Sequence, residues 1–150
     1  MPIEPPTPAR PDESPAVTAL LAAQLDEHAI PLERALLEET VASALLDDGR
    51  ALVLLARDGE HPVGVAYLSF QLTLEYGGRV VWLEELYVVP ERRGQGIGQR
   101  LLEACLEVAR ARGCRAVELE VEGSHARAAN LYARAGFRAL DRVHWALPLG

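Results

Sequence analysis

The sequence predicts an α/β (α+β) fold, a mixed sheet with helices on its faces. Three consecutive segments rich in Val, Leu and aromatic residues are separated by turn sequences, which is typical of antiparallel hairpins. Segments with apolar residues at helical spacing lie before and after them. The third strand, the next helix and the following strand form one βαβ crossover over residues 79–122, which places a parallel pair beside the hairpins.

The chain of 150 residues has the length of one domain. Six of its ten prolines lie within the first fifteen residues. We therefore expect residues 1–14 to form a tail or a short edge strand and residues 15–150 to form a single domain. Two amphipathic helices open this domain. The first begins at Pro15, and the second begins near Leu32 and ends before Asp47.

Strands and helices then follow one another along the rest of the chain. The predicted strands of the antiparallel meander are 51–57, 63–74 and 79–89, joined by turns at 58–62 and 77–78. The elements predicted after the meander are a helix over 96–112, a strand over 115–122, a helix over 125–135 and a last strand over 137–147. The predicted order is therefore ααβββαβαβ.

All fifteen basic residues are arginines, because the sequence contains no lysine. This absence excludes a Schiff base to a carbonyl or pyridoxal cofactor and a P-loop lysine on a nucleotide phosphate. Arginine cannot replace lysine as a base or nucleophile, because its pKa lies above ~12. The net charge of −7 disfavours nucleic acid and anionic membranes as partners and favours a cationic small molecule.

The sequence also predicts a soluble cytoplasmic protein without a metal site. No apolar run reaches the roughly 18–20 residues of a membrane span, and the N-terminus does not resemble a signal peptide. Cys105 and Cys114 lack metal-ligand spacing and are too few for a disulfide framework. His28, His61 and His144 are dispersed, which also disfavours a metal site.

The stretch most informative about function is the Arg- and Gly-rich segment 88–100, which links a strand to a helix. Its glycines let the backbone approach a ligand closely, and unpaired N–H groups at the helix start form an anion site. Arg92, Arg93 and Arg100 add positive charge in an acidic chain, which is consistent with several phosphate groups. The segment therefore predicts a phosphate cradle without lysine.

A dinucleotide-binding fold also places glycines between a strand and a helix. Glu118 lies about twenty residues further on, where that fold has a ribose-binding acid. However, Gln99 and Leu101 stand where the third glycine of G-x-G-x-x-G is required, and only two strands follow the helix. These departures argue against a dinucleotide fold.

At this segment the sequence resembles the GNAT family of N-acetyltransferases. Arg93-x-x-Gly96-x-Gly98 matches the family's R/Q-x-x-G-x-G/A acetyl-CoA signature, and the order ααβββαβαβ matches the family's fold, with its βαβ core that binds acetyl-CoA. Residues 82–90, Leu131-Tyr132 and Gly136-Phe137 resemble most the branch of diamine, polyamine and thialysine acetyltransferases. The resemblance extends from about residue 17 to residue 147.

The resemblance implies that acetyl-CoA binds along the end of the central strand and the following turn. The pyrophosphate is expected on the N–H groups of residues 94–99 and the pantetheine arm on the backbone of residues 86–88, with the Val88 N–H as oxyanion donor. His125 stands where the family most often has an asparagine that contacts the cofactor. The expected cofactor-binding residues are Leu86, Tyr87, Val88, Arg93, Gly94, Gln95, Gly96, Ile97, Gly98, Gln99, His125 and Tyr132.

Two adjacent carboxylates, Glu84 and Glu85, are candidates for the catalytic base that removes a proton from an amine acceptor. In an unbroken strand Glu84 shares one face with Trp82, Leu86 and Val88, and Glu85 lies on the opposite face. The resemblance favours Glu84, acting through water, over Glu85. Both could instead be solvated or pair with a neighbouring arginine.

The thiolate that leaves the thioester needs a proton, which a phenol close to the sulfur can supply. Tyr132 matches the tyrosine of the family's Leu-Tyr motif, which implies the role of general acid, although a helical tyrosine can also serve only for packing. Neither cysteine is placed as an acyl carrier. The resemblance therefore implies direct transfer in a ternary complex.

The sequence thus predicts an N-acetyltransferase that moves the acetyl group of acetyl-CoA to a primary amine, such as a small amine, a polyamine or an amino-acid-like acceptor. Asp26, Glu27 and Glu75 are candidate partners for the acceptor ammonium. Two alternatives stay open, namely a protein or peptide N-acetyltransferase and a non-catalytic acyl-CoA-binding regulatory domain. Analogy with dimeric relatives favours a homodimer.

Overall fold

The computed structural model describes residues 3–122 and 125–150, and the chain divides into two compact units. The first unit is Met1–Glu120 and the second is Val121–Gly150. The sheet and the helices that pack on it belong to the first unit, and the helix that follows the last strand belongs to the second.

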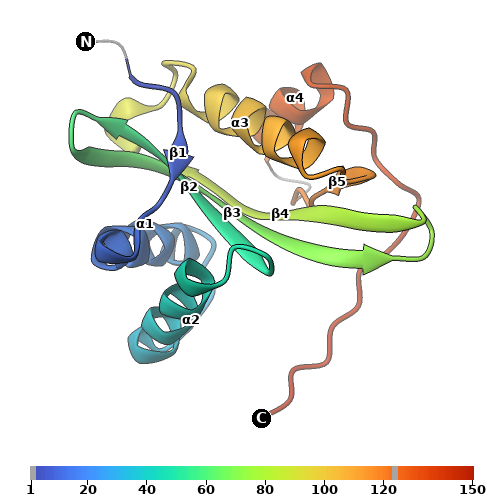
Figure 1. Ribbon diagram of the computed structural model, residues 1–150, viewed down its shortest axis with the longest axis horizontal. Coiled ribbons are helices and arrows are strands. Elements are labelled where there is room, and N and C mark those ends of the chain that lie inside the picture. Colours follow the sequence, from blue (N-terminus) through green and yellow to red (C-terminus); the bar gives the residue numbers. More distant parts are fainter. Residues whose placement is uncertain (1–2, 123–124) are drawn as a thin grey trace. The chain divides into compact units, whose positions relative to one another are not determined.

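The sheet of the first unit has the strand order β1-β2-β3-β4-β5 (Figure 1). Its strands are β1 (Thr7–Pro8), β2 (Ala51–Asp58), β3 (His61–Thr73), β4 (Gly78–Val88) and β5 (Ala116–Glu118). The first four pair antiparallel in succession, and β5 pairs in parallel with β4. The predicted meander and crossover are therefore confirmed, although β5 is shorter than expected.

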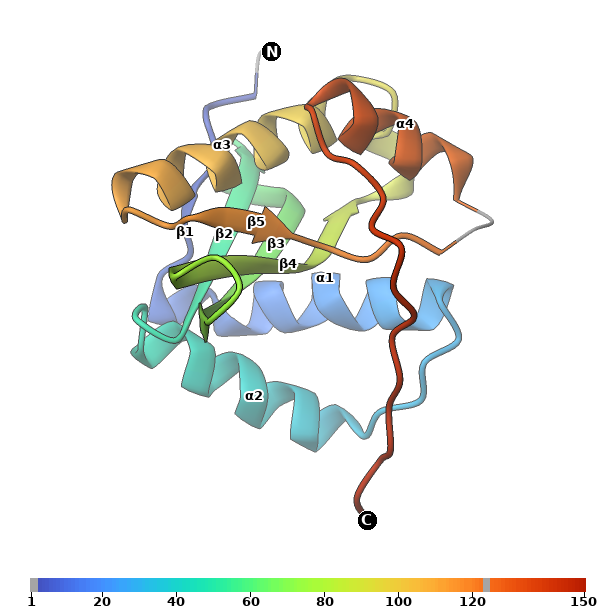
Figure 2. The same cartoon turned by 90° about the vertical axis from the view of Figure 1, so that its right-hand side faces the viewer.

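Helices cover both faces of this sheet (Figure 2). α1 (Ser14–Glu27) and α2 (Arg34–Leu46) pack on one face, and α3 (Ile97–Ala111) packs on the other. Gly113, with φ 70°, directly follows the C-cap of α3, where a left-handed residue commonly ends a helix. All three helices lie within two residues of the boundaries that the apolar spacing predicts.

The core is built from the inner faces of these layers. On the side of α1 and α2, Val17, Val41 and Leu55 are fully buried within one cluster. On the side of α3, Leu101 and Cys105 are fully buried. Each buried Leu or Val side chain contributes about 1.5–3 kcal/mol of transfer free energy. This packing fixes the position of β4 between two helical layers.

The N-terminal segment lies at the edge of the sheet, where Thr7 is opposite Leu55. The Arg57 guanidinium of β2 donates to both carboxylate oxygens of Glu13, at 2.7 and 2.9 Å, and also to the Thr7 hydroxyl. These contacts lower the pKa of the Glu13 carboxyl to about 2. The ion pair therefore persists at neutral pH and holds the segment to β2. The division into a 1–14 segment and a 15–150 domain remains a prediction.

The second unit contains α4 (Ala126–Arg134) and an extended chain after it. The predicted last strand over 137–147 is wrong, because these residues form no strand. Val143, Trp145 and Leu147 alternate as predicted but are largely exposed. Alternation defines the two faces of a strand, whereas a strand also needs a neighbour that pairs with its backbone N–H and C=O groups.

Among the described residues, no helix combines the length and the apolar character needed to cross a membrane. α3 has the greatest length in that part of the chain, with fifteen residues, and its outer face is charged. The cytoplasmic location, the homodimer and the absence of a metal, nucleic-acid or membrane partner remain predictions.

Candidate active site

A single extra residue interrupts the pairing of β4 with β3. Leu83 of β4 lies opposite Leu68 of β3. Glu85, two residues after Leu83, lies opposite Tyr67, which is only one residue before Leu68. Glu84 is therefore the additional residue of a β-bulge, which bends a strand and disrupts its ladder. The bulge divides β4 into an upstream and a downstream half.

The downstream half of β4 has a strand partner on one side only. β5 pairs with β4 up to Trp82, and among the described residues of the first unit no strand continues this pairing. The Val89 N–H donates to the Val63 carbonyl at 3.0 Å, so alternate residues of this half point their backbone groups toward β3. The backbone groups of Leu86 and Val88 therefore point to the open edge.

The bulge places both carboxylates on the face that α1 and α2 cover. Glu85 is opposite Tyr67, which packs against the core cluster of that face. Glu84 interacts with the Ser69 hydroxyl, which lies on the same face two residues along β3. The prediction that Glu84 and Glu85 lie on opposite faces is therefore wrong, because the extra residue reverses the alternation of the strand.

The same reversal puts Val88 on the face covered by α3, away from the two carboxylates. Val88 lies opposite Gly64 of β3. A Cβ at Gly64 would lie 3.0 Å from the Leu101 Cδ1 and 3.3 Å from the Ile97 Cγ2. A larger residue at this position would push the first turn of α3 away from the sheet. Gly64 therefore sets the distance between the end of β4 and the start of α3.

The pKa of the Glu84 carboxyl lies above its ordinary value. Surrounding protein atoms remove part of its hydration, which is the largest cause, and the neighbouring charge of Glu85 acts in the same direction. The hydrogen bond from Ser69 opposes this rise. Burial and the Glu84 charge also raise the pKa of the Tyr67 hydroxyl. Glu84 nevertheless stays exposed, so solvent can reach this carboxylate, which its raised pKa makes a stronger proton acceptor.

Glu85 is oriented by a side chain from a distant part of the sequence. Gln24 of α1 donates from Nε2 to the Glu85 Oε2 at 2.9 Å, and the same nitrogen lies 3.5 Å from the Leu86 carbonyl oxygen. The sequence does not identify Gln24 or Ser69 as site residues. No local signal predicts them, because Gln24 precedes Glu85 by 61 residues and Ser69 belongs to no motif.

The Gly-rich turn between β4 and α3 has the backbone that an anion site requires. After a short turn, η2 (Pro90–Arg92), Gly94 and Gly96 take φ values of 79° and 82°, in the left-handed region that favours glycine. Gly96 is the N-cap of α3, and no side chain caps this helix end. The first N–H groups of α3, at residues 97–99, are therefore available to an anion.

Several residues expected to bind acetyl-CoA have side chains that are committed elsewhere. Tyr87 and Ile97 are only 5% and 2% exposed, because both side chains belong to the core. The Gln95 Oε1 accepts a hydrogen bond from the Arg92 Nε at 3.2 Å, and Gln99 donates to a glutamate one turn along α3. Tyr87 therefore offers no side chain to a ligand at the open edge, and its backbone groups point toward β3. Ile97 can offer only its backbone N–H, at the start of α3.

The arginines around the turn also have partners in the first unit. The Arg92 Nη1 lies 2.7 Å from the Asp58 Oδ2, and the Arg93 Nη2 lies 2.5 Å from the Glu27 Oε2. Arg100 donates to a backbone carbonyl of the N-terminal segment. The hydrogen bond from Arg93 lowers the pKa of the Glu27 carboxyl. Glu27, a candidate partner for the acceptor ammonium, is therefore ionised and already paired with Arg93.

The remaining residues considered from the sequence are two acidic residues and two cysteines. Asp26 is exposed near the end of α1, and Glu75 is exposed between β3 and β4. Cys105 is buried in α3, and burial raises the pKa of its thiol to about 12. This thiol therefore stays protonated at neutral pH and is a poor nucleophile. Cys114 lies half-buried beyond the end of α3.

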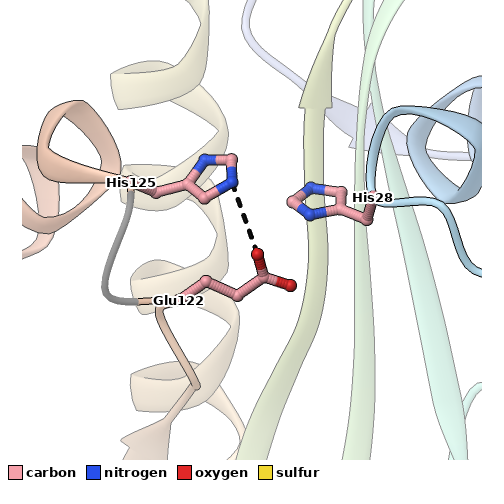
Figure 3. Close-up of side chains that lie close together, drawn as sticks. All are labelled: His28, Glu122 and His125. Carbon is pink, nitrogen blue, oxygen red and sulfur yellow. Dashed lines mark ion pairs between the residues drawn. The ribbon is translucent and has the colours of Figure 1, made fainter.

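The second unit holds the remaining two expected site residues. The His125 Nε2 lies 3.6 Å from the Glu122 Oε2, and the two side chains form an ion pair when the imidazole is protonated (Figure 3). His125 is the N-cap of α4, and its carbonyl accepts from the Ala129 N–H at 3.0 Å. The Tyr132 ring packs edge-on against Phe137, with ring centroids 5.8 Å apart. The contact restricts the Tyr132 ring, whose role as general acid remains a prediction.

Residues 16–137 match the model of the acetyltransferase (GNAT) family. The chain belongs to this family. Over 80 residues it is 39% identical to a thialysine N-epsilon-acetyltransferase of Bos taurus, a match that covers 53% of this chain and 45% of that protein. Over 94 residues it is 36% identical to an aminoglycoside N(6')-acetyltransferase type 1 of Klebsiella aerogenes, covering 61% of each chain.

The family's fold is also found in solved structures. An integron cassette protein from the mobile metagenome of Cole Harbour Salt Marsh superposes with a TM-score of 0.86 at 23% identity, covering 97% of this chain and 91% of that one. This likeness confirms the predicted α+β fold. The chain spans less than two thirds of the length of the two curated relatives above.

Proposed function

We propose that the protein is an acetyl-CoA-dependent N-acetyltransferase that acetylates a primary amine. The observation that carries this proposal is the bulge at Glu84. It puts two carboxylates on one face of a strand whose downstream half has an open edge and leads into the Gly-rich turn. Membership of the GNAT family supports acetyl-CoA as the donor.

The donor would bind mainly to backbone groups. The N–H groups of residues 94–99 would hold its pyrophosphate at the uncapped start of α3. The N–H groups of Leu86 and Val88 point to the open edge, where the amides of an extended arm can add like a strand. The two carbonyls already accept from Gln24 and Arg93, and each has a second lone pair for the arm. The Val88 N–H would then donate to the thioester oxygen as negative charge develops on it.

The proton transfers would involve Glu84 and Tyr132. Glu84 takes a proton from the acceptor ammonium, directly or through water, and the free amine attacks the acetyl carbon. The new C–N bond forms, the C–S bond breaks, and Tyr132 donates its phenolic proton to the departing thiolate. The nitrogen of the new amide loses its second proton to solvent, Glu84 releases the proton that it took, and Tyr132 regains one from solvent. Both groups return to their starting states, and one proton is released in each cycle.

A small cationic amine fits the charge of this site best. Glu84 and Glu85 share one face, and the chain as a whole carries a net charge of −7. Two of the relatives are named for thialysine and for an aminoglycoside, both of which carry amino groups. A diamine, a polyamine or an amino-acid-like amine is therefore the proposed acceptor class.

The test is release of free thiol from acetyl-CoA across a panel of acceptors. The panel contains thialysine, spermidine, an aminoglycoside and a peptide with a free N-terminus. We expect turnover with at least one small amine and none with the peptide. Turnover with the peptide alone would assign a protein acceptor, and acetyl-CoA binding without turnover on any acceptor would favour a regulatory domain.

The proposed acid is tested by Tyr132→Phe, which keeps the ring contact with Phe137. We expect kcat to fall about 10²-fold or more because the proton donor is lost, while the dissociation constant for acetyl-CoA changes little. Tyr76→Phe, in the turn between β3 and β4, is the matched control. An unchanged kcat in Tyr132→Phe would leave this tyrosine with a packing role only.

A further inference from the structure

Arg92 and Arg93 precede the Gly-rich turn, and each is bound to a carboxylate from a different neighbouring element. The Arg92 Nη1 lies 2.7 Å from the Oδ2 of Asp58, the last residue of β2. The Arg93 Nη2 lies 2.5 Å from the Oε2 of Glu27, the last residue of α1. The start of the turn is therefore tied to two separate parts of the first unit.

Arg93 makes further contacts with the end of β4. Its Nε donates to the Val88 carbonyl at 2.9 Å, and its guanidinium lies 5.3 Å from the centre of the Tyr87 ring. The Tyr87 hydroxyl in turn interacts with Glu27. One guanidinium thus joins the open end of the strand, the end of α1 and the start of the turn.

A phosphate on Arg93 would compete with these contacts. Carboxylate and phosphate bind a guanidinium in the same planar geometry, so both cannot use the same N–H groups at once. A phosphate bound in this geometry through Nε and Nη2 would displace Glu27 and would leave the Val88 carbonyl without its side-chain donor. The N–H groups at residues 97–99 face no such competition, because no side chain caps α3.

We propose that Arg92 and Arg93 are positioning residues, which fix the Gly-rich turn and the end of β4 through Asp58 and Glu27 and leave the phosphates to backbone N–H groups. The proposal rests on the proposed function, because its ligand is coenzyme A. In this proposal Arg93, the arginine of the family signature, holds the end of β4 in place. Shape, rather than added positive charge, is then what these two arginines contribute.

The sign of one effect separates a positioning residue from a phosphate ligand. We expect Glu27→Gln and Asp58→Asn to weaken the binding of coenzyme A by about three- to tenfold, because the turn loses its anchors. If Arg93 bound phosphate and Glu27 only restrained it, Glu27→Gln would free the guanidinium and tighten binding. Tighter binding of coenzyme A in titration calorimetry would therefore overturn the proposal.

A matched control removes the same charge at a distance from the turn. Glu38 pairs with Arg34 at 3.8 Å on the exposed side of α2, and Glu38→Gln changes the net charge as Glu27→Gln does. We expect its coenzyme A affinity to equal that of the wild type. A loss in Glu38→Gln as large as that in Glu27→Gln would mean that net charge, not the anchor, sets the affinity, and would also overturn the proposal.

Exchange of the two charges gives a second readout. Arg93→Glu alone should weaken coenzyme A binding at least as much as Glu27→Gln. Combining it with Glu27→Arg restores an ion pair at unchanged net charge, and we expect recovery to within about threefold of the wild type. A double variant no better than the single one would contradict a positioning role. If Arg93→Glu fails to fold, Arg93→Gln, Glu27→Gln and their double variant yield the same coupling.

Failure of the proposed function would give a different result. A wild-type chain that binds no coenzyme A overturns the proposed donor. The coupling between Arg93 and Glu27 is then still measured by thermal unfolding of the two single variants and the double variant. Strictly additive shifts in unfolding temperature would overturn the positioning role on their own.

Discussion

The two halves of β4 differ in what surrounds them. Upstream of Glu84, the strand pairs with β3 on one side and β5 on the other, and Val81 and Leu83 are buried. Downstream, it pairs with β3 alone, and Leu86 and Val88 direct their backbone groups to an open edge. One extra residue thus separates a segment paired on both sides from a segment with an open edge.

The two adjacent glutamates show the same contrast at the level of side chains. Glu85 accepts a hydrogen bond from Gln24 and is half-buried. Glu84 is exposed, yet the pKa of its carboxyl is raised. In a regular strand they would point in opposite directions, and the bulge gives them one face and different partners. Neighbouring residues of one type can therefore take separate roles.

The largest expected effect is that of Glu84→Gln on catalysis. Loss of a general base should lower kcat by about 10²–10⁴-fold, whereas Glu85→Gln, the matched variant, should cost less than about tenfold. Both are measured as thiol release at saturating acceptor and acetyl-CoA. If Glu85→Gln lowers kcat more than Glu84→Gln, the general base is Glu85, which Gln24 orients.

The raised pKa of Glu84 predicts how Glu84→Gln changes the unfolding temperature, and this measurement checks that the variant folds. A carboxyl whose pKa is raised in the folded protein binds its proton more readily there than in the unfolded chain, so its ionisation costs stability as pH rises above the unfolded value. Glu84→Gln removes this cost. We therefore expect its unfolding temperature at neutral pH to equal or exceed that of the wild type.

The difference in packing between the two halves should be visible in stability. Leu83→Ala removes a side chain that is 3% exposed and should lower the free energy of unfolding by about 2–4 kcal/mol. Leu86→Ala removes a half-buried side chain and should cost about half as much or less. Urea denaturation measures both values. Equal losses would mean that the downstream half is as tightly packed as the upstream half.

The environment of Glu84 predicts two opposite shifts in the pH profile. Because the base must be ionised, the acid limb of kcat/KM should follow the raised pKa of Glu84. Ser69→Ala removes a hydrogen bond that lowers this pKa, so the limb should move to higher pH. Glu85→Gln removes a negative charge that raises it, so the limb should move to lower pH. Shifts in the same direction would exclude Glu84 as the titrating group.

The smallest expected effect is that of Gln24→Leu. It removes the donor to Glu85, and a net hydrogen bond to a charged group is worth about 1.5–3 kcal/mol when buried and less at this partly exposed site. We expect the KM for the amine to rise about three- to fivefold with kcat nearly unchanged. Gln71→Leu, at an exposed position of β3, is the control and should leave KM unaltered.

The elements that follow from local periodicity could be predicted from the sequence. Apolar residues at helical spacing located α1, α2 and α3, and turn sequences such as Gly77-Gly78 located the hairpins. The segment 137–147 has the right alternation but forms no strand, because alternation does not supply a pairing partner. Pattern therefore locates elements, whereas the pairing of strands depends on the rest of the chain, and so does the face of a side chain next to a bulge.

The candidate site shows the same limit. The Gly-rich turn and Glu84 could be found by motif, because glycine in the left-handed region and a carboxylate in a strand are unusual where they stand. The partners of Glu85 and Arg93 could not be found in this way. Gln24 and Glu27 come from α1, more than sixty residues earlier, and only packing of α1 on the sheet brings them there.

The amino-acid sequence alone identifies the groups that the chain carries: a Gly-rich turn between a strand and a helix, two adjacent carboxylates in a strand, and no lysine. How these groups are arranged depends on the tertiary structure. The bulge at Glu84 sets which side chains share a face, and ion pairs to Asp58 and Glu27 occupy the arginines. The physical reason is that strand register and ion pairing depend on contacts between distant segments, which no local pattern encodes.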